Sequence, residues 1–446
     1  MRRSHGRPRD GPGPTGRTLG RDRKLLHVAA MDQDKGANRV LRSSLKVGAS
    51  LLVAFLLGEG LLRLVPHTLT DFHSSFQYSG DPDVGYLPLP RQDAAYNLAC
   101  LRNPHVRTNG LGFRGGEWQA TRSPRIALLG DSYMLALTID ERRHLASLLR
   151  SSTGGEIWNA GVSGYGTFQE LLVWRKVLRD RKPDLTVLFL YLENDVRDNH
   201  CGLSRAEGQI YSPCLEIRAG EPHQRTDFEL RRPDAGWKTW LKTNCYTFRA
   251  LRKLSGKRPS RPPRGRFFDQ ESFAYNVYRP HLSRQWDEAW QVTEWALKEL
   301  KAETEAAGSR LLVVNVPGPL QLAPDWRAEL TAQIGAEPAP ADFDMQYPLT
   351  RLEAIAASAA IDLLDLRPAF LAYRDRHALK APVFGWCCDG HWNPLGHRLA
   401  ADLVHDRLVA SGWIEGEVLP ETAPPLEVLG EALYADIFQC GTAALE

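Results

Sequence analysis

The feature that most constrains the fold is an alternation, from residue 125 onward, of short apolar runs with segments of helical periodicity. Apolar runs of this length are typical of strands buried on both faces, and the periodic segments are typical of covering helices. Elements that alternate in this way form βαβ units, with a parallel sheet between two helical layers. The sequence therefore predicts a three-layer α/β/α sandwich with a mainly parallel five-stranded sheet. The strands are expected at 125–130, 156–160, 185–193, 310–316 and 361–366, and the helices at about 141–151, 168–180, 286–307, 348–359 and 394–411.

Charge is unevenly distributed along the chain. The 446 residues carry a net charge of +3, but residues 1–46 contain 12 Lys/Arg and 4 Asp/Glu, so this arm carries +8 and the remainder −5. A main domain with that balance lacks the basic face that nucleic-acid binding needs, and no nucleic-acid partner is expected. The Arg-, Gly- and Pro-rich start of the arm is typical of disorder.

Residues 47–65 form the one long apolar segment, VGASLLVAFLLGEGLLRLV. As a helix, this segment would be roughly 28 Å long, which is close to the thickness of a hydrocarbon core. Glu59 and Arg63 interrupt it, but they stand four residues apart and can pair near the membrane interface. The segment is therefore expected to be a transmembrane anchor, with a buried core helix and a cleaved signal peptide as the alternatives.

The flanking charges indicate the orientation of this anchor. Basic residues precede it at Arg39, Arg42 and Lys46, whereas none occurs between Arg63 and Arg91. The positive-inside rule then places the N-terminus in the cytoplasm and everything after about residue 66 outside. We expect a single-pass protein of the inner (cell) membrane with an extracytoplasmic main domain.

The seven cysteines fit an oxidising compartment loosely. Cys201 and Cys214 bracket a short loop and can form a disulfide there. Cys387 and Cys388 are adjacent, and a bond between neighbours is strained. Because the chain has no C-x-x-C spacing, a zinc site is not expected.

Composition divides the chain into five segments. An insertion between the third and fourth strands contains a Pro/Arg-rich stretch, and insertions beside a site often form lids or partner surfaces. The segments are a basic disordered cytoplasmic arm (1–46), the transmembrane anchor (47–65), an irregular N-terminal extension (66–124), the α/β domain (125–411) with its insertion (196–285), and a C-terminal tail (412–446).

Polar and reactive residues follow three of the expected strands and precede the last helix. Ser132 comes directly after the first strand, in RIALLGDSYM. The second strand runs into the glycine-rich turn NAGVSGYG (159–166), and the third ends in YLEND (191–195). The loop before the last helix reads DGHWNPLGH (389–397). Because parallel strands end at one edge of a sheet, these groups are expected to meet there.

Together these groups supply what acyl transfer requires. A serine hydroxyl needs a base to act as a nucleophile, and imidazole titrates near neutral pH. Asp389 and His391 stand two residues apart, so in an extended loop both side chains face the same way and the carboxylate can orient the imidazole. The oxygen of the tetrahedral intermediate also needs preset hydrogen-bond donors, for which a glycine N–H is well suited.

These four blocks resemble the SGNH (GDSL-type) serine hydrolase family over roughly residues 125–411. The resemblance implies a flavodoxin-like sandwich that works without a metal or a cofactor. It implies Ser132 as the nucleophile, His391 as the base and Asp389 as the orienting acid. It also implies an oxyanion hole formed by the N–H of Ser132, the N–H of Gly164 and the side-chain amide of Asn194. The segment TNGLGFRG and the N-terminal apolar segment resemble the membrane-tethered bacterial branch of that family.

Simpler roles remain open for several of these residues. Asp131 is expected to cap the turn that follows the first strand. Gly164 can be a turn glycine only, and Asn194 can satisfy backbone groups at a strand end. Glu193 stands where the family usually has glycine, and on a strand it would point away from Asn194.

Other site types fit the same segments less well. The Asp389–His391 spacing can bind a metal, but no third and fourth ligands are evident. GVSGYG reads G-x-x-G-x-G, which is not the order of a dinucleotide-binding turn.

DGHWNPLGH offers two histidines. Asn393 is a good helix N-cap and Pro394 suits the first helical position, so a helix is expected to begin there. His397 then lies about one turn inside the helix and is expected to be structural, which leaves His391 as the base.

The sequence therefore predicts an extracytoplasmic, membrane-tethered esterase. The expected reaction removes an acyl group, such as acetyl, from an acylated carbohydrate or lipid. The alternatives are an O-acyltransferase that modifies an exported polysaccharide with the same residues, and a catalytically silent scaffold of the cell envelope.

Overall fold

The computed structural model describes residues 39, 42–62, 73–97, 104–233, 237–254, 267–335, 338–379, 383–386, 389–431 and 437. The chain divides into two compact units. The first unit comprises Met1–Pro66 and Cys245–Thr247, and the second comprises His67–Asn244 and Phe248–Glu446.

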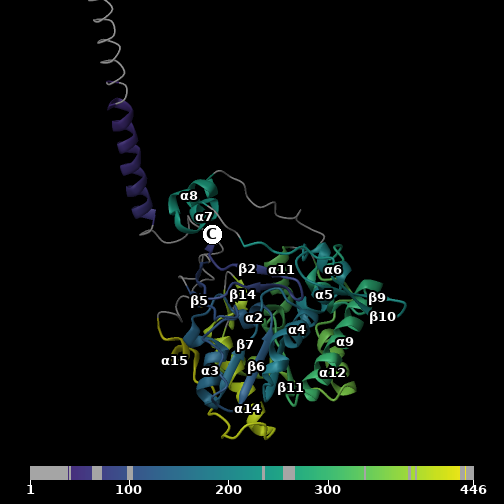
Figure 1. Ribbon diagram of the computed structural model, residues 1–446. Helices are drawn as coiled ribbons and strands as arrows, with labels where there is room; N and C mark the ends of the chain where they lie inside the picture. Colours follow the sequence, from purple (N-terminus) through teal and green to yellow (C-terminus); the bar gives the residue numbers. More distant parts are fainter. Residues whose placement is uncertain are drawn as a thin grey trace, which may run out of the picture. The chain divides into compact units, whose positions relative to one another are not determined.

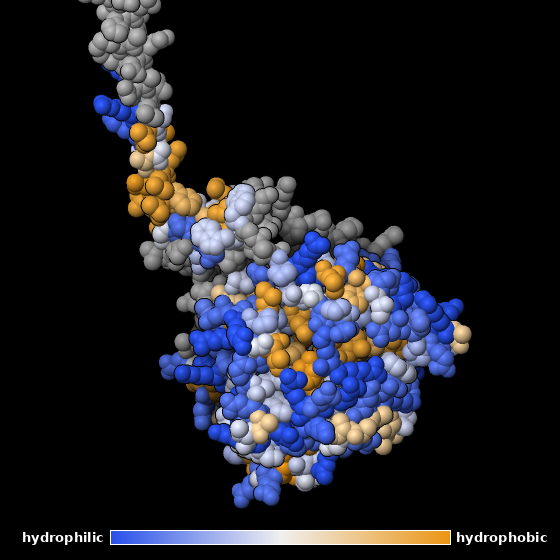
Figure 2. Space-filling view, in the orientation of Figure 1, coloured by the Kyte–Doolittle hydropathy of each residue, from blue (hydrophilic) through white to orange (hydrophobic). Residues whose placement is uncertain are grey.

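The first unit contains an apolar helix, Arg42–Leu62, that is long and apolar enough to cross a membrane. The apolar part of this helix is not buried by any of the described residues. Leu57, for example, is 69% exposed. Figure 2 shows hydrophobic colour gathered on this helix, whereas the visible surface of the second unit is mostly hydrophilic. A core helix would be largely buried, so this helix is consistent with a single-pass anchor or a signal sequence.

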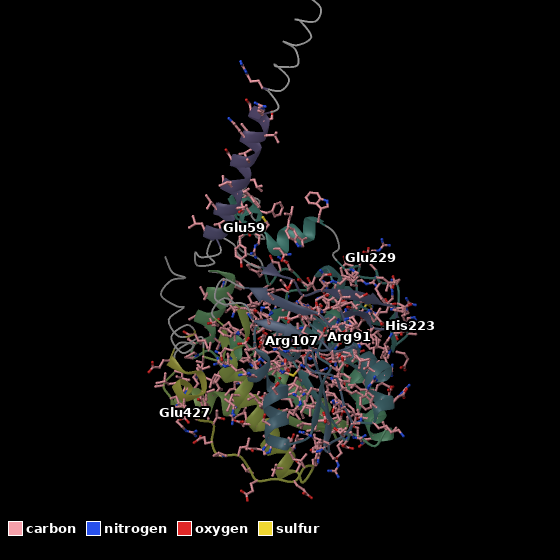
Figure 3. All side chains as sticks on the ribbon, turned by 60° about the vertical axis from the view of Figure 1, so that its left-hand side comes forward. Glu59, Arg91, Arg107, His223, Glu229 and Glu427 are labelled. Atoms are coloured by element: carbon pink, nitrogen blue, oxygen red, sulfur yellow. A yellow bond between two sulfur atoms is a disulfide. The ribbon has the colours of Figure 1, made fainter. Side chains whose placement is uncertain are left out.

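Glu59 lies near the end of this helix (Figure 3). Its carboxylate accepts hydrogen bonds from the backbone N–H of Tyr246 at 2.9 Å and of Thr247 at 2.8 Å. The hydroxyl of Thr247 donates to the same carboxylate at 3.0 Å. The expected partner Arg63 lies outside the described residues. Donors from Cys245–Thr247 therefore satisfy the acidic group of the apolar helix.

The second unit is built on a five-stranded parallel sheet with the strand order β12-β11-β8-β6-β7. Every residue of β8 is buried, as expected for a parallel strand covered on both faces. The predicted α/β sandwich with a five-stranded parallel sheet is therefore confirmed. The strands are β6 (Arg125–Gly130), β7 (Glu156–Asn159), β8 (Leu185–Leu190), β11 (Arg310–Asn315) and β12 (Asp362–Asp365).

Helical layers cover both faces of this sheet (Figure 1), because alternate strand residues face opposite sides. Ala127 and Leu129 of β6 belong to one hydrophobic core, and Ile126 and Leu128 belong to a second core. The first core includes α4 (Thr167–Val173), α5 (Leu192–Asn199), α9 (Arg284–Ala306) and α12 (Tyr347–Ser358), and the second includes α3 (Leu145–Thr153), α13 (Arg367–Arg376) and α14 (Pro394–Ala410).

The segment before β6 was expected to be irregular, but it contains short strands. They are stabilised by aromatic contacts: the ring centroids of Tyr78 and Tyr86 lie 5.3 Å apart, and those of Tyr86 and Tyr165, which are distant in the chain, lie 5.1 Å apart. Strands this short leave little periodicity in a sequence. They are β1 (His73–Ser74), β2 (Tyr78–Asp81), β3 (Gly85–Pro88), β4 (Asp93–Asn97) and β5 (His105–Arg107).

The third strand ends earlier than the sequence predicted. β8 stops at Leu190 and α5 begins at Leu192, so the expectation of a strand to residue 193 is wrong. At the start of this helix, the Asp195 carboxylate accepts a hydrogen bond from the N–H of Tyr191 at 2.8 Å, which favours a helix over a continued strand. Glu193 and Asn194 therefore lie in the first turn of a helix and not on opposite faces of a strand.

The insertion at 196–285 is partly structured. Cys201 and Cys214 are joined by a disulfide, a pairing that the sequence allowed but did not decide, whereas Cys387 and Cys388 lie outside the described residues. The described elements of the insertion are α6 (Cys201–Ala206), the antiparallel hairpin β9 (Cys214–Arg218) and β10 (Glu221–Arg225), α7 (Trp237–Asn244), α8 (Tyr246–Leu254) and the 3₁₀ turn η5 (Ala274–Tyr278).

Smaller elements complete the described fold. They are α2 (Ser132–Leu135), η2 (Glu141–Arg143), η3 (Trp174–Leu178), η4 (Arg179–Arg181), α10 (Pro319–Leu322), α11 (Trp326–Ile334), the antiparallel pair β13 (Gly385–Trp386) and β14 (Asp389–Trp392), and α15 (Pro425–Leu429).

Candidate active site

The strand β6 delivers Ser132 to the carboxyl edge of the sheet. Ser132 is the first residue of α2, a helix of one turn. Asp131 caps this helix, as the sequence predicted, because its carboxylate accepts a hydrogen bond from the N–H of Tyr133 at 2.9 Å. The apolar run of β6 therefore ends in a sharp turn that leaves the serine at the start of a helix.

The pair β13–β14 brings Asp389 and His391 to the same place. Both residues lie on β14, two positions apart, so their side chains leave the same face of the strand. The Nδ1 atom of His391 lies 2.5 Å from Oδ1 of Asp389, and its Nε2 atom lies 2.7 Å from Oγ of Ser132. With Nδ1–H donating to the carboxylate, Nε2 is the atom that can accept the serine proton.

Electrostatics favour a charged state of this pair. Burial alone would lower the pKa of His391, but the hydrogen bond and the charge of Asp389, together with the charge of Asp131, raise that pKa above 6.5. For Asp389, burial would raise the pKa, but the hydrogen bonds and the charge of His391 lower it below 3.8. The arrangement therefore stabilises an imidazolium next to Ser132.

Asp131 also links Ser132 to Asn194. One oxygen of its carboxylate, Oδ2, lies 3.4 Å from Oγ of Ser132 and 3.3 Å from Nδ2 of Asn194. Burial raises the pKa of Asp131, while the N–H of Tyr133, the charge of His391 and the donors of Asn194 and Ser132 oppose this shift. The structure thus brings Asn194 next to the serine from the first turn of α5.

Gly164 lies in the loop between β7 and α4. Its φ of +80° is a left-handed conformation that favours glycine, and a Cβ at this position would come within 2.9 Å of the Tyr86 hydroxyl. The turn therefore requires glycine on steric grounds alone. Whether its N–H faces a reacting oxygen stays a prediction from the sequence.

His397 lies inside α14 and is buried, as expected from the helix start. The side chain of Asn393 caps that helix by accepting from the N–H of Leu395 at 2.9 Å and of Gly396 at 3.2 Å. Burial, together with the charges of nearby groups, keeps the pKa of His397 well below 6.5. This histidine is therefore neutral and packed, whereas His391 contacts Ser132.

Glu193 forms part of a buried tyrosine cluster. Its carboxylate accepts hydrogen bonds from the hydroxyls of Tyr191 and, at 2.7 Å, of Tyr278. Burial raises the pKa of Glu193 to about 7, although the two hydroxyls lower it. The carboxylate of Glu193 thus binds the two tyrosines, whereas the amide of Asn194 donates to Asp131.

Tyr133 is a site residue that the sequence reasoning missed. Its ring centroid lies 5.0 Å from that of His391, and its hydroxyl donates to the carbonyl of Gly390 at 3.4 Å. Tyr133 packs between α2, which begins at Ser132, and β14, which contains His391. Its place directly after Ser132 is the signal that could have pointed to it.

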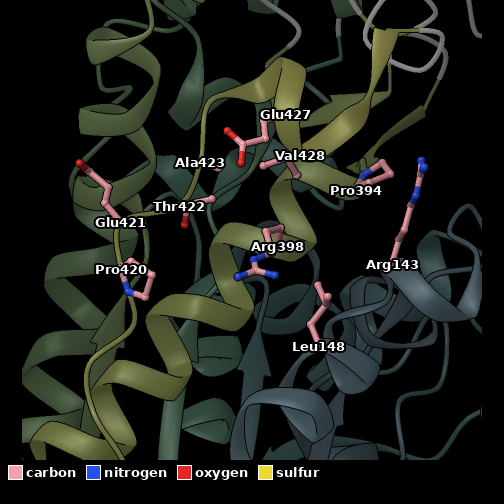
Figure 4. A pocket seen from close by; sticks show the side chains of 10 residues that line it. All are labelled: Arg143, Leu148, Pro394, Arg398, Pro420, Glu421, Thr422, Ala423, Glu427 and Val428. Carbon is pink, nitrogen blue, oxygen red and sulfur yellow. The ribbon is translucent and has the colours of Figure 1, made fainter.

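No group of three or more His, Cys, Asp or Glu side chains in the described part of the chain could hold a metal ion. A cavity of about 400 Å³ lies beside the start of α14, with Arg143 and Arg398 in its wall (Figure 4). None of Ser132, Asp389 and His391 lines this cavity. It is therefore separate from the serine site.

A scan against protein-family models and a search of curated protein sequences give no match for this chain. Among solved structures, the chain is similar to the acetyl xylan esterase AlAXEase, with a TM-score of 0.34, 14% identity and coverage of 63% of this chain and 97% of that chain. It is also similar to the acetylxylan esterase Axe2 from Geobacillus stearothermophilus (TM-score 0.34, 13% identity, 66% and 98%) and to TesA (TM-score 0.31, 13% identity, 64% and 97%). All three are distant similarities.

Proposed function

We propose that this protein is a serine ester hydrolase of the SGNH type. The observation that carries the proposal is the run of contacts from Asp389 through His391 to Ser132, with separations of 2.5 Å and 2.7 Å, at the carboxyl edge of a parallel sheet. This is the constellation that acyl transfer to serine needs, since it joins a nucleophile, a base and an orienting acid. We assign the hydrolase domain to residues 125–411.

In the proposed mechanism, Oγ of Ser132 attacks the carbonyl carbon of the ester while Nε2 of His391 takes the serine proton. The N–H groups of Ser132 and Gly164 and the amide of Asn194 donate to the oxyanion of the tetrahedral intermediate. His391 then gives its proton to the departing alcohol, which leaves an acyl-serine. Water attacks this ester with His391 again as the base, and the carboxylic acid leaves.

Asp389 has a distinct role in this scheme. It accepts the Nδ1 proton of His391, which fixes the tautomer and stabilises the imidazolium that forms twice in each cycle. Asp131 holds the amide of Asn194 beside the serine through the contacts at 3.3 and 3.4 Å on its Oδ2 atom. No step requires a metal or a cofactor.

The proposed substrate is an acylated carbohydrate or lipid outside the cytoplasm. The apolar helix Arg42–Leu62 supports a membrane anchor, and the disulfide between Cys201 and Cys214 supports an oxidising compartment. Both features agree with a single-pass protein of the cell membrane whose hydrolase domain is extracytoplasmic.

The experiment is to measure hydrolysis of nitrophenyl acetate and of longer nitrophenyl esters by the purified full-length protein, with Ser132→Ala as the control. We expect hydrolysis and covalent labelling by a fluorophosphonate probe, both lost in the control. A parallel assay adds an exported polysaccharide as acceptor, and acyl transfer that outpaces hydrolysis would indicate an O-acyltransferase instead. A wild-type protein that neither hydrolyses nor labels would indicate a silent scaffold.

A further inference from the structure

The N-terminal extension contributes a buried guanidinium to the back of the serine turn. Arg114 belongs to the stretch TNGLGFRG, and its side chain is only 1% exposed. The preceding turn is held by Asn109, whose side-chain oxygen accepts from the N–H of Leu111 at 2.9 Å and of Phe113 at 3.1 Å. Arg114 thus follows a turn that is held by side-chain hydrogen bonds.

The guanidinium of Arg114 binds the carbonyls at the end of the serine helix. It donates to Leu135 at 2.9 Å, and also to the carbonyls of Ala136 and Ile139. Its Nε atom donates to the Glu141 carboxylate at 3.2 Å. Carbonyls at a helix C-terminus have no partner within the helix, and a cation there is favourable.

A second carbonyl of α2 is held by two further buried donors. The carbonyl of Met134 lies 2.9 Å from Nε2 of His144 and accepts from the amide of Asn159 at 2.8 Å. The Nδ1 atom of His144 accepts from the N–H of Ala146 at 3.0 Å, so Nε2 must carry the proton in the neutral ring. Burial, together with the charge of Arg114, lowers the pKa of His144 well below 6.5 and keeps the ring neutral.

The amide of Asn159 ties the same helix to the glycine turn. Its oxygen accepts from the N–H of Gly161 at 3.0 Å, in the loop that contains Gly164. A Cβ at Gly161 would lie 2.8 Å from the N–H nitrogen of Leu135, so the loop and α2 are in direct backbone contact. The two segments that carry proposed oxyanion donors are therefore fixed against each other.

We propose that Arg114 and His144 form a positioning frame that sets the place of Ser132 for acyl transfer. The proposal rests on the proposed function of the serine site. A helix of four residues has no stability of its own, so its place is determined by the groups that bind its ends. Asp131 binds the N-terminus of α2, and Arg114 and His144 bind carbonyls at its C-terminal end.

The proposed role of Arg114 requires a side chain that can donate to several carbonyls at once. Arginine presents five donors in a rigid plane and can bind several carbonyls at once, whereas lysine offers a single flexible ammonium. A displacement of a nucleophile by about 1 Å can lower a rate about 100-fold. Arg114 thus acts on catalysis through α2, without touching the substrate.

The test compares Arg114→Lys and Arg114→Met with the matched control Arg107→Lys. Arg107 belongs to the same extension, but its side chain is 78% exposed and pairs with Asp93. Active sites are counted by fluorophosphonate titration, folding is checked by circular dichroism, and kcat and KM are measured per titrated site. We expect kcat to fall at least tenfold in both Arg114 variants, with KM within twofold, and no change in the control.

A purely structural role would lower the melting temperature and the number of titratable sites but leave kcat per site within twofold, which would overturn the proposal. Should the Arg114 variants not fold, His144→Gln and His144→Leu carry the test. Glutamine retains a donor for the carbonyl of Met134 and leucine does not, so we expect kcat to be retained in the first and lost in the second. Equal kcat in both would overturn the frame.

Assays of the wild-type protein distinguish a failure of this proposal from a failure of the proposed function. If it neither hydrolyses esters nor labels, the proposed function fails and the catalytic role of the frame fails with it. If it is active and the Arg114 and His144 variants keep kcat, the frame alone is wrong.

Discussion

Nε2 of His391 lies 2.7 Å from Oγ of Ser132, although the two residues are 259 positions apart in the chain. The contact is made by elements at opposite ends of the α/β domain, the turn after β6 and the short strand β14. Folding of the whole domain is therefore needed before the serine has a base. Nucleophile and base are expected to act as one unit.

The first prediction follows from that unit. Replacement of His391 by alanine should lower kcat for nitrophenyl acetate about as much as Ser132→Ala, by at least about 10⁴-fold, because each variant leaves the other group without a partner. Asp389→Asn should lower kcat by about four orders of magnitude, since the amide no longer holds the imidazole in the tautomer whose Nε2 accepts the serine proton. Steady-state kinetics on folded protein checks both. A His391→Ala variant with a near-normal rate would show that the base is wrongly assigned.

His397 should behave differently. Its ring is buried against His144, with centroids 5.2 Å apart, whereas the histidine hydrogen-bonded to Ser132 is His391. His397→Ala should lower the free energy of unfolding by about 2–4 kcal/mol, because it leaves a cavity in the core, while kcat per folded molecule changes little. Denaturant titration and kinetics on the same samples separate the two quantities. His105→Ala is a suitable control, since the His105 side chain is 62% exposed.

Both histidine assignments rest on features that the sequence contains. Asn393 and Pro394 form a standard helix start, so the sequence alone predicts that His397 is inside a helix and His391 is before it. The strands β6, β8 and β11 were equally predictable, because buried parallel strands are continuous apolar runs. These features depend on residues that are close together in the chain.

The missed features depend on specific side-chain contacts, several of them between residues far apart in the chain. Tyr191 and Leu192 continue the apolar run of β8, but the strand stops at Leu190 and α5 begins at Leu192, where the Asp195 carboxylate accepts the N–H of Tyr191. The strands of the N-terminal extension are stabilised by contacts such as Tyr86 with Tyr165. Arg114 binds carbonyls 21 to 25 residues further along the chain. Single-sequence periodicity carries no information on such pairs.

The rate should depend on pH through His391. Its neutral form is the base, and Asp389 raises its pKa above 6.5 despite the opposing effect of burial, so kcat/KM should rise with pH through a pKa above 6.5. Asp389→Asn should move this rise to lower pH, because the raising charge is gone. Glu193, with a pKa raised to about 7 by burial, titrates in the same range, and Glu193→Gln should leave the rise in place. Loss of the rise in Glu193→Gln would assign it to that carboxyl instead.

Stability should depend on pH through His144. Its pKa is lowered well below 6.5 in the folded chain, mainly by burial, so below pH 6.5 the unfolded chain binds a proton that the folded chain does not. The titration of this histidine therefore leaves stability unchanged well above pH 6.5 and lowers it progressively as the pH falls below that value. Buried carboxyls with raised pKa values, such as Glu193, act in the opposite direction, so a difference measurement is needed.

That measurement compares the wild type with His144→Gln. The free energy of unfolding of the wild type, relative to the variant, should fall by about 1 kcal/mol between pH 7 and pH 5.5, because glutamine does not titrate. Urea titrations of both proteins at the two pH values provide the numbers. A constant difference would mean that His144 has the same pKa in the folded and unfolded chains, which would contradict the lowered pKa.

The last prediction concerns the membrane. The helix Arg42–Leu62 has 21 residues, about 31 Å at 1.5 Å per residue, which matches a hydrocarbon core. Basic residues precede it, so the N-terminus should be cytoplasmic and the serine site extracytoplasmic.

In a bacterial host, the protein should sediment with membranes and resist carbonate extraction, and protease added outside the inner membrane should digest the hydrolase domain. A variant that lacks residues 1–66 and is exported by a foreign cleaved signal should be soluble and keep kcat. If the native chain instead loses its N-terminal tag on export and becomes soluble, the helix is a signal peptide. Full-length protein in the soluble cytoplasm would contradict the anchor and remove the oxidising compartment proposed for the disulfide between Cys201 and Cys214.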